Sequence, residues 1–365
     1  ALNRAWLQVS SGAFDYKTAV KRAVDGLADS MPYVTYPSGH RDTLEVACRR
    51  AVLTGVNQTG AKLQEARMDE MGASFVEVTA HGGARPSHAV WQGRRYHRGG
   101  EADYLGQHYE DFESATGYGT GAGLCGWNCR HTFFVVFPEL GSPPAWTQKS
   151  LEALNARDIE YDGGLYTRYE ISQMQRARER AVRKWKRRYL AEDAAGADTT
   201  ASAVKLRQAR QSLADFTRAT GGRVDSARTS IHGFGRSEAS RASYAARKQE
   251  RFNAANTELQ QMRKAGTIKA KGRLIESPSA PNEINFASDH VLQRWAERGM
   301  GPMDAERIIR SSKVAMSQRN GTQTCYYSEL GFVAIGQDGN VSSIGPLDEG
   351  GKKLMEVVKK HGIPH

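Results

Sequence analysis

The sequence has 365 residues, which is more than one compact core usually needs and therefore predicts two or three folded units. Charged residues make up 25% of it, and it lacks a run of about 18 consecutive apolar residues, which excludes a membrane-spanning helix and predicts no membrane partner. Four cysteines are too few for a disulfide scaffold at this length, so the composition suits a reducing compartment.

The formal net charge of +11 is unevenly placed along the chain. Residues 168–273 hold 25 Lys and Arg against 10 Asp and Glu, whereas the remainder is slightly acidic. A polyanion would therefore dock on this middle segment. Two interpretations stay open, a nucleic-acid or acidic-protein contact and a solvated helical face. The candidate nucleic-acid contacts are Arg183, Lys184, Lys186, Arg187 and Arg188.

The first 145 residues predict two helices followed by a loop-rich core. Apolar residues recur at helical spacing over residues 15–29, with Asp15 as the cap, and over residues 43–68. Residues 75–79 and 132–137 are expected to be strands, and glycine, histidine and aromatic residues crowd between them. Because Trp6 and Leu7 resemble the middle of a helix and there is no initial Met, we expect this region to lack an N-terminal part.

Helical periodicity returns in a basic segment that spans residues 146–265. Helices are predicted over residues 169–190, 201–220 and 237–264, and the second stops at Gly221-Gly222. Residues 266–283 have the Gly, Ser and Pro composition of a linker, so a domain boundary is expected there.

The segment 284–365 is predicted to be a separate small domain. Helices are expected over residues 289–299, 302–311 and 352–361, and strands over 322–328, 332–336 and 341–344, with Asp338-Gly339 as a hairpin turn. Helices that lead into an antiparallel meander make an α+β domain, and we assign the whole chain to the α+β class.

The glycine-rich core holds histidines and cysteines but no standard catalytic motif. Thiolate and imidazole groups at this spacing suit a tetrahedral zinc site, which would also order a glycine-rich stretch. The spacing Cys125-x3-Cys129-x-His131 is not a standard zinc pattern, so the favoured interpretation is a hydrogen-bonded core of buried polar groups and no metal is assigned. The candidate zinc ligands are His81, His88, Cys129 and His131.

Several ordered motifs carry a family resemblance over roughly residues 1–250. They are His81–Gly93 (HGGARPSHAVWQG), Thr116–Gly119 (TGYG), Gly126–His131 (GWNCRH), the basic helix around Tyr169 and Gln173, and Gly233–Ser240 (GFGRSEAS). Together they closely resemble the core of the phage minor capsid protein 2 family. Cys125 does not belong to that pattern, whereas Cys129 and His131 do.

The resemblance implies a structural role in the head of a tailed phage or prophage. It implies a virion component of low copy number inside the capsid near the portal, present in the host cytoplasm during assembly. The partners implied are the portal, other head proteins and packaged DNA, and no enzymatic activity is implied for this core. Its motif residues suit a structural core, in which Trp91 supplies a large buried face and arginines connect loops through several hydrogen bonds. They are His81, Arg85, His88, Trp91, Asn128, Cys129, Arg130 and His131.

The C-terminal segment presents a histidine and two arginines on one helix stripe. His290, Arg294 and Arg298 are spaced i, i+4, i+8. An imidazole beside guanidinium groups suits phosphodiester cleavage without a metal, since the histidine moves a proton while arginine holds the phosphate. A solvated His–Arg stripe is the alternative.

The order of elements in this segment is similar to the barnase–EndoU–colicin–RelE-like nuclease group found in phage head proteins. The resemblance implies an RNase or toxin-like activity on RNA, with His290 and Arg294 as the catalytic pair. Weaker assignments are Thr322, Tyr326 and Ser343. The alternative is a purely structural virion protein whose C-terminal domain binds DNA or the portal without catalysis.

Overall fold

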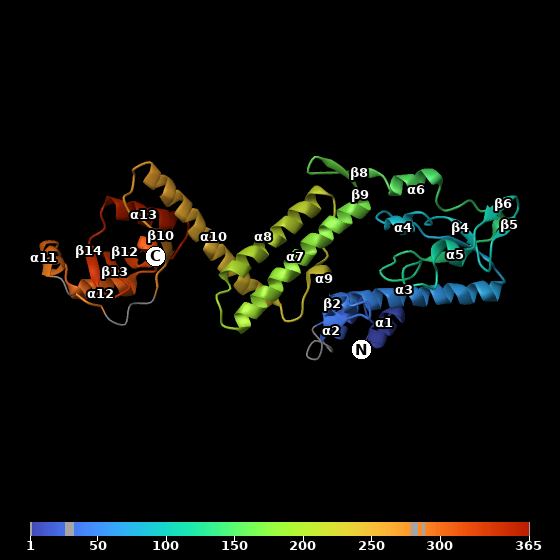
Figure 1. The fold of residues 1–365 in the computed structure, drawn as a ribbon, viewed down its shortest axis with the longest axis horizontal. Helices are drawn as coiled ribbons and strands as arrows, with labels where there is room; N and C mark the ends of the chain where they lie inside the picture. Colours follow the sequence, from blue (N-terminus) through green and yellow to red (C-terminus); the bar gives the residue numbers. More distant parts are fainter. Residues whose placement is uncertain (1, 26–32, 279–283, 287–288, 365) are drawn as a thin grey trace. The chain divides into compact units, whose positions relative to one another are not determined.

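In a computed structural model, the chain is described for residues 2–25, 33–278, 284–286 and 289–364. It combines helices with several small antiparallel sheets and one larger sheet, which confirms the α+β class (Figure 1). The chain divides into two compact units. Unit 1 consists of Ala1–Ala197 and Lys205–Ala239, and unit 2 of Asp198–Val204 and Ser240–His365. None of the described helices is both long and apolar enough to span a bilayer.

Unit 1 begins with helices that pack around one long helix. Asp15 accepts a hydrogen bond from the Thr18 amide, as expected of a helix cap. Ala19 and Val20 of α2 pack against Cys48 and Val52 of α3. Part of the expected helix over residues 15–29 lies outside the described residues. The elements are α1 (Leu2–Ser10), α2 (Tyr16–Asp25), β1 (Tyr33–Thr35), β2 (Arg41–Thr43) and α3 (Leu44–Met71).

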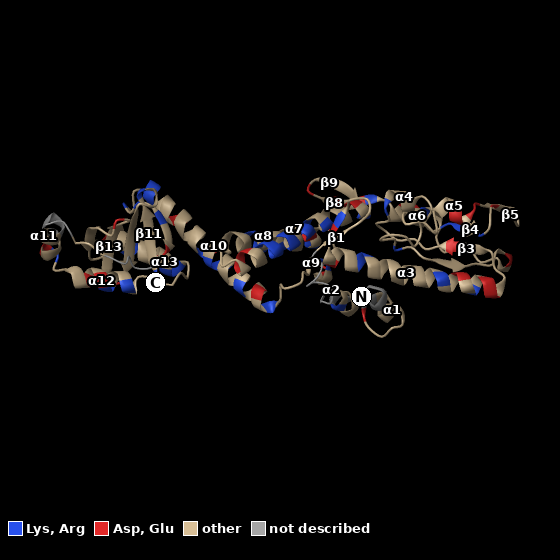
Figure 2. Cartoon of the chain, turned by 60° about the horizontal axis from the view of Figure 1, so that its bottom comes forward, with Lys and Arg blue, Asp and Glu red and all other residues tan. Residues whose placement is uncertain are grey.

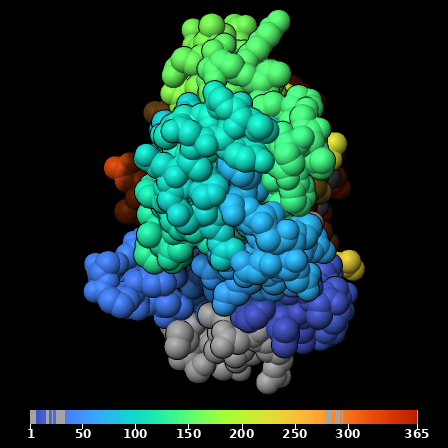
Figure 3. All heavy atoms as spheres, turned by 90° about the vertical axis from the view of Figure 1, so that its right-hand side faces the viewer, coloured from blue at the N-terminus to red at the C-terminus, as the bar shows by residue number. Residues whose placement is uncertain are grey.

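A three-stranded antiparallel sheet of order β4-β3-β7 forms the centre of residues 75–137, which we call the β3 region. Its apolar side packs on α3, and the cyan and teal segment lies directly against the light-blue end of that helix (Figure 3). Both expected strands, β3 and β7, are present. The elements are β3 (Phe75–Val78), α4 (Pro86–Ala89), β4 (Arg95–His97), β5 (Ala102–Tyr104), β6 (Gln107–Tyr109), α5 (Phe112–Thr116) and β7 (Phe133–Val135).

The basic segment, residues 146–265, forms most of the rest of unit 1 and also contributes to unit 2, which includes Asp198–Val204 and α10 from Ser240 onward. The Thr167 hydroxyl and the Glu170 carboxylate cap α7 reciprocally, so the helix begins where the expected periodicity does. The remaining elements are η1 (Pro138–Leu140), α6 (Gln148–Leu154), β8 (Arg157–Tyr161), β9 (Gly164–Thr167), α7 (Arg168–Ala194), α8 (Thr200–Ala219), α9 (Ser226–Thr229) and α10 (Arg236–Lys264).

Unit 2 is built on a five-stranded antiparallel sheet of order β10-β11-β12-β13-β14. The expected strands and their hairpin are present, and two further strands extend the sheet. The elements after α10 are β10 (Arg273–Glu276), α11 (Asp289–Glu297), α12 (Pro302–Ser311), β11 (Val314–Gln318), η2 (Arg319–Gly321), β12 (Gln323–Ser328), β13 (Gly331–Gly336), β14 (Val341–Gly345) and α13 (Glu349–Lys360).

The segment expected to be a linker, residues 266–283, contains β10, which pairs with β11 at the sheet edge. Phe252 and Leu259 of α10 pack with Leu354 of α13 on one face of this sheet. Trp295 of α11 and Ile308 of α12 pack on the other. Unit 2 therefore starts well before residue 284, because α10 supplies apolar side chains that its sheet needs.

Candidate functional site

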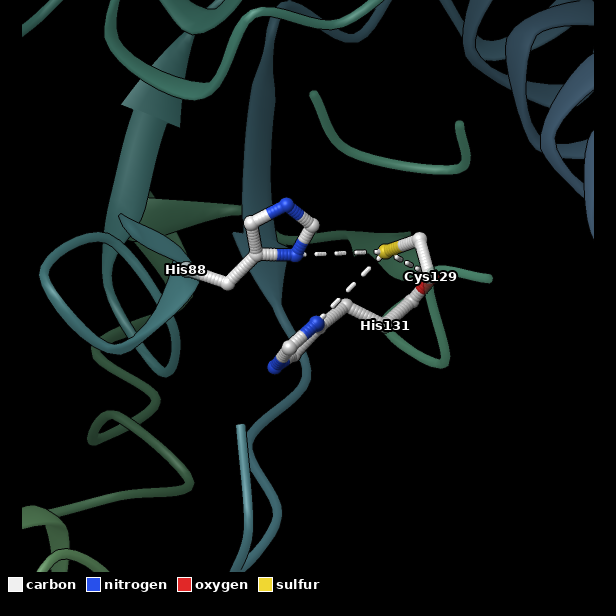
Figure 4. Close-up of side chains that lie close together, drawn as sticks. All are labelled: His88, Cys129 and His131. Atoms are coloured by element: carbon white, nitrogen blue, oxygen red, sulfur yellow. Dashed lines mark hydrogen bonds between the residues drawn. The ribbon is translucent and has the colours of Figure 1, made fainter. Parts of the chain in front are cut away.

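Three potential metal-binding side chains meet at one end of the β3 region (Figure 4). His88 lies on α4, whereas Cys129 and His131 lie in the loop before β7. The Cys129 Sγ atom is 3.6 Å from His88 Nδ1 and 3.5 Å from His131 Nδ1. All three residues are buried, and their ligand atoms lie within 4.8 Å of one another. The fold thus joins positions 41 residues apart into a histidine–cysteine cluster (His88, Cys129 and His131).

Hydrogen bonds on the far side of each imidazole determine which nitrogen carries the proton. His88 Nε2 lies 2.9 Å from the Ala122 carbonyl oxygen, and His131 Nε2 lies 3.0 Å from Gln92 Oε1. The His81 amide also donates to Gln92 Oε1, which identifies that atom as the oxygen. Both Nε2 atoms must therefore donate, so both Nδ1 lone pairs face the Cys129 sulfur.

The loop that carries Cys129 is held by close backbone packing and by α3. The Asn57 side-chain amide donates to the carbonyl oxygens of Cys129, at 3.2 Å, and His131, at 3.1 Å. A Cβ atom at Gly123 would overlap the backbone of Gly117, so only glycine permits this approach. The local backbone therefore fixes where the sulfur and the His131 ring lie.

Aromatic rings enclose the cluster. The His88 ring lies 4.4 Å from the Trp91 ring, whose exposed fraction is 5%. The His81 ring stacks on His131 at 4.3 Å. His81 Nδ1 lies 3.1 Å from the Gly82 carbonyl, and its buried Nε2 has no hydrogen-bond partner among the described residues. His81 thus presents an unused lone pair beside the cluster.

A cavity of about 280 Å³ borders the cluster, and we call it the cationic cavity. Arg85 is fixed there by a 2.6 Å hydrogen bond to the Trp127 carbonyl. Burial, with neighbouring Arg228 and Arg130, lowers the pKa of Arg176. The cavity is lined by His81, His88, Cys129, His131, Asn128 and α7 residues such as Tyr169 and Gln173, and its charge comes from Arg85, Arg130, Arg168 and Arg176. Its chemistry favours an anion.

Burial keeps the cluster neutral near pH 7. It lowers the pKa of the His131 imidazole to about 3 and also lowers that of His88. Burial raises the pKa of the Cys129 thiol, although hydrogen bonds from nearby backbone groups oppose this effect. The unliganded cluster therefore holds two neutral imidazoles and one thiol.

The proposed nucleic-acid contacts on α7 divide into structural and exposed groups. Arg183 and Lys186 are buried and donate to the carbonyl oxygens of Arg228 and Thr229 in α9. Arg187 pairs with Glu45 of α3 at 2.9 Å. These three side chains join elements of unit 1, and the burial of Arg183 and Lys186 leaves little of them accessible to a nucleic acid. Exposed members of the set are Lys184 and Arg188, the latter paired with Glu192 at 2.7 Å.

The C-terminal candidates do not all share one face of the sheet. Tyr326 is 2% exposed and packs in the apolar cluster beneath α11 and α12. Ser343 pairs with Ala334, which belongs to the opposite face. Thr322 is exposed in the turn before β12. His290 and Arg294 lie on α11, but their side chains are outside the described part of the chain.

Sequence reasoning gave no role to the residues that orient the cluster. Gln92 follows His88 by four positions in the motif His81–Gly93, and this spacing was the only signal in the sequence that could have linked Gln92 to the cluster. Asn57 lies in another helix, and Ala122 contributes only its carbonyl oxygen. Such partners become visible only in the fold.

Comparison with protein-family models gives a match to phage minor capsid protein 2 over residues 1–218. The matched part includes the histidine–cysteine cluster, the cationic cavity and α7. No curated protein and no solved structure matches the chain.

Proposed function

The chain belongs to the phage minor capsid protein 2 family and is a structural phage protein, and from this premise we propose that it acts in head morphogenesis inside the capsid, beside the portal. The observation that carries the proposal is the family match over more than half of the chain. The fold is consistent with a structural role, because buried or partly buried polar side chains of the matched part join its elements.

Cross-linking within purified particles tests this location. Peptides of unit 1 should be recovered from virions at low copy number and should cross-link to portal peptides. Cross-links to the major capsid lattice alone, or absence of the chain from particles, would contradict the proposal.

A DNA contact is part of the proposed function, and it falls on the exposed face of α7. Arg180, Lys184 and Arg188 are exposed at spacings of four residues, so they form one stripe along the helix. Lys and Arg are dense on α7 and α8 (Figure 2). The side chains of this stripe are available to phosphates, whereas those of Arg183 and Lys186 already donate to backbone carbonyl oxygens.

Retention of duplex DNA by the full chain measures this contact. The double variant Arg180→Glu/Lys184→Glu should lose most of the binding. The fall of log K with log salt should also become shallower by about 2, one for each lost phosphate contact. The matched control is Lys62→Glu/Arg67→Glu, which changes the net charge equally at exposed positions of α3. Equal losses in both variants, or binding insensitive to salt, would contradict a specific basic stripe.

A second candidate function is RNA cleavage by unit 2. The observation that favours it is the arrangement of α11 and α12 over one face of an antiparallel meander, with α11 in contact with β14. In this proposal His290 and Arg294 act on the phosphodiester, and Thr322 is the accessible candidate near the sheet. Tyr326 is buried and Ser343 lies on the opposite face of the sheet, so in this proposal both residues support the fold of unit 2 and do not contact the RNA.

Labelled RNA incubated with the full chain distinguishes the two versions of unit 2. Cleavage that falls about 10²–10⁴-fold in His290→Ala supports a nuclease. The matched control is His108→Ala, an exposed histidine of unit 1 that should leave cleavage unchanged. RNA that stays intact across salt and pH supports the alternative, a unit that binds DNA or the portal without catalysis.

A further inference from the structure

We infer that His88, Cys129 and His131 bind one Zn²⁺ ion through Nδ1, Sγ and Nδ1, and that the fourth coordination position opens to the cationic cavity. The three atoms already converge, and all three residues line that cavity. This inference does not depend on a role at the portal.

The two sulfur–nitrogen distances of the cluster fit zinc, and its two imidazole ligand atoms lie within 4.8 Å of each other. With a Zn–S bond of about 2.3 Å and a Zn–N bond of about 2.0–2.1 Å, a tetrahedral angle separates sulfur from nitrogen by about 3.5–3.6 Å. The two observed separations are 3.6 Å and 3.5 Å. The sulfur is thus already placed relative to both imidazoles as in a zinc site.

Proton accounting favours a cation over a hydrogen-bonded thiol. The carbonyl oxygen of Ala122 and Gln92 Oε1 require protons on both Nε2 atoms, so two Nδ1 lone pairs face one sulfur. A thiol has one proton and can satisfy only one of them. A zinc ion bound to the thiolate satisfies the sulfur and both nitrogens together, and the thiol proton is released to solvent.

The surroundings supply the second shell that zinc ligands commonly have. A metal-bound histidine usually donates its other ring N–H to a carbonyl or carboxylate, which fixes the ring. His88 and His131 both do so here. Gln92 is fully buried and held in turn by the His81 amide. The ligand geometry is therefore preorganised.

The open position has a defined neighbourhood. Three protein ligands with a fourth position for solvent is the arrangement that zinc adopts where it binds an exchangeable ligand. The unpartnered His81 Nε2 lies beside the cluster and can accept a hydrogen bond from zinc-bound water. The cavity arginines suit a small anion such as phosphate at this position.

Metal analysis of the purified full chain tests the inference. After exposure to Zn²⁺ and removal of excess metal, wild type should retain about one zinc per chain. Co²⁺ in place of zinc should give the visible absorption of a tetrahedral ion and a thiolate charge-transfer band. Cys129→Ser and His131→Ala should reduce the metal content to less than a tenth. The matched control is Cys125→Ser, a buried cysteine of the same loop, which should keep it.

Two further variants keep the test decisive if a ligand variant fails to fold. Gln92→Ala removes no ligand but frees the His131 ring, so its zinc affinity should fall about 10–100-fold in a chelator competition. His81→Ala should retain zinc, and inorganic phosphate should change the cobalt spectrum of wild type.

Four outcomes would contradict the inference. Wild type without stoichiometric zinc and without the thiolate–cobalt band excludes the site. Equal loss of metal in Cys125→Ser and Cys129→Ser shows a folding effect instead of ligation. Loss of zinc in His81→Ala, or a cobalt spectrum unchanged by phosphate, removes the open position. None of these results bears on the location of the chain in the virion.

Discussion

The β3 region of unit 1 and the sheet of unit 2 are stabilised in different ways. The β3 region buries Glu77, His88, Gln92 and His131, and each of them bonds to a particular atom elsewhere in the region. The unit 2 sheet is covered on both faces by apolar side chains of helices. Removing one partner of a directed polar contact leaves the other partner buried without a hydrogen bond, which costs stability at once. Removing apolar side chains lowers stability in proportion to the buried volume that is lost. The two regions should therefore respond to different substitutions.

The largest expected effect follows loss of the buried carboxylate in β3. Glu77 is 1% exposed. Its carboxylate accepts one hydrogen bond from Arg95 Nε at 2.7 Å and another from the Ala145 amide at 2.7 Å. Glu77→Ala removes the carboxylate that neutralises the Arg95 guanidinium, which keeps its hydrogen bonds to the Ser142 and Pro143 carbonyl oxygens but loses its counter-charge. The substitution should lower the free energy of unfolding of unit 1 by about 3–5 kcal/mol. Urea unfolding followed by a unit 1 probe measures this change.

The control for this variant is Glu110→Ala, an exposed glutamate that should change stability by about 0.5 kcal/mol or less. A loss below about 1 kcal/mol in Glu77→Ala would show that the pair contributes little. The two regions would then not differ in the way their contacts indicate.

In unit 2 the corresponding test removes apolar volume. Leu259 of α10 is fully buried against the sheet. Leu259→Ala should lower the unfolding free energy of unit 2 by about 2–5 kcal/mol and leave the histidine–cysteine cluster unaffected. The comparison is Leu330→Ala, a half-exposed leucine, which should cost much less. Similar losses at both positions would mean that α10 does not belong to the unit 2 core.

Most long helices could be predicted from the sequence, because their apolar periodicity and caps are local signals. The limits of α7, α10 and α12 fall within a few residues of the expected ones. Strand β11 (VAMSQ) was missed because these residues carry weak strand preference, and its pairing with β12 is the property that defines it. Strand β10 was missed because Gly- and Pro-rich sequence surrounds it.

The candidate site could be predicted only in part. The Cys-x3-Cys-x-His spacing identified Cys129 and His131 as candidate ligands, and His88 was also among the candidate zinc ligands. That the three meet depends on contacts over 41 residues, which spacing does not encode. The contacts that Arg183 and Lys186 make within unit 1 could not be predicted from the sequence for the same reason. Their acceptors are carbonyl oxygens 45 and 43 residues away, and a count of basic residues cannot detect such acceptors.

The smallest expected effect concerns the buried charge of Lys186. Burial, together with Arg210 and Arg183, lowers the pKa of this ammonium from 10.5 to about 8. Its Nζ atom donates to the Thr229 carbonyl at 2.7 Å and lies 5.2 Å from the Phe234 ring. Deprotonation of this side chain should therefore contribute to the change in stability of unit 1 at alkaline pH.

The sign of this dependence follows from proton binding. Below pH 8 both folded and unfolded chains bind the proton, so the fold bears the full cost of burying the charge. Between about pH 8 and 10.5 the unfolded chain binds more protons, so the stability contributed by Lys186 rises with pH. After screening by solvent, the rise should be about 1–2 kcal/mol.

Lys186→Met removes the titrating group and retains much of the apolar stem, so the variant should lack this rise. Urea unfolding of unit 1 at pH 7.5, 9 and 10.5 gives the difference in stability between wild type and variant. That difference should move in favour of wild type as the pH increases, since cysteine and tyrosine ionisation affects both chains alike. A difference that stays flat would mean that the Lys186 ammonium is as well solvated as those on the surface, and that the basic helix does not hold α9 through a buried charge.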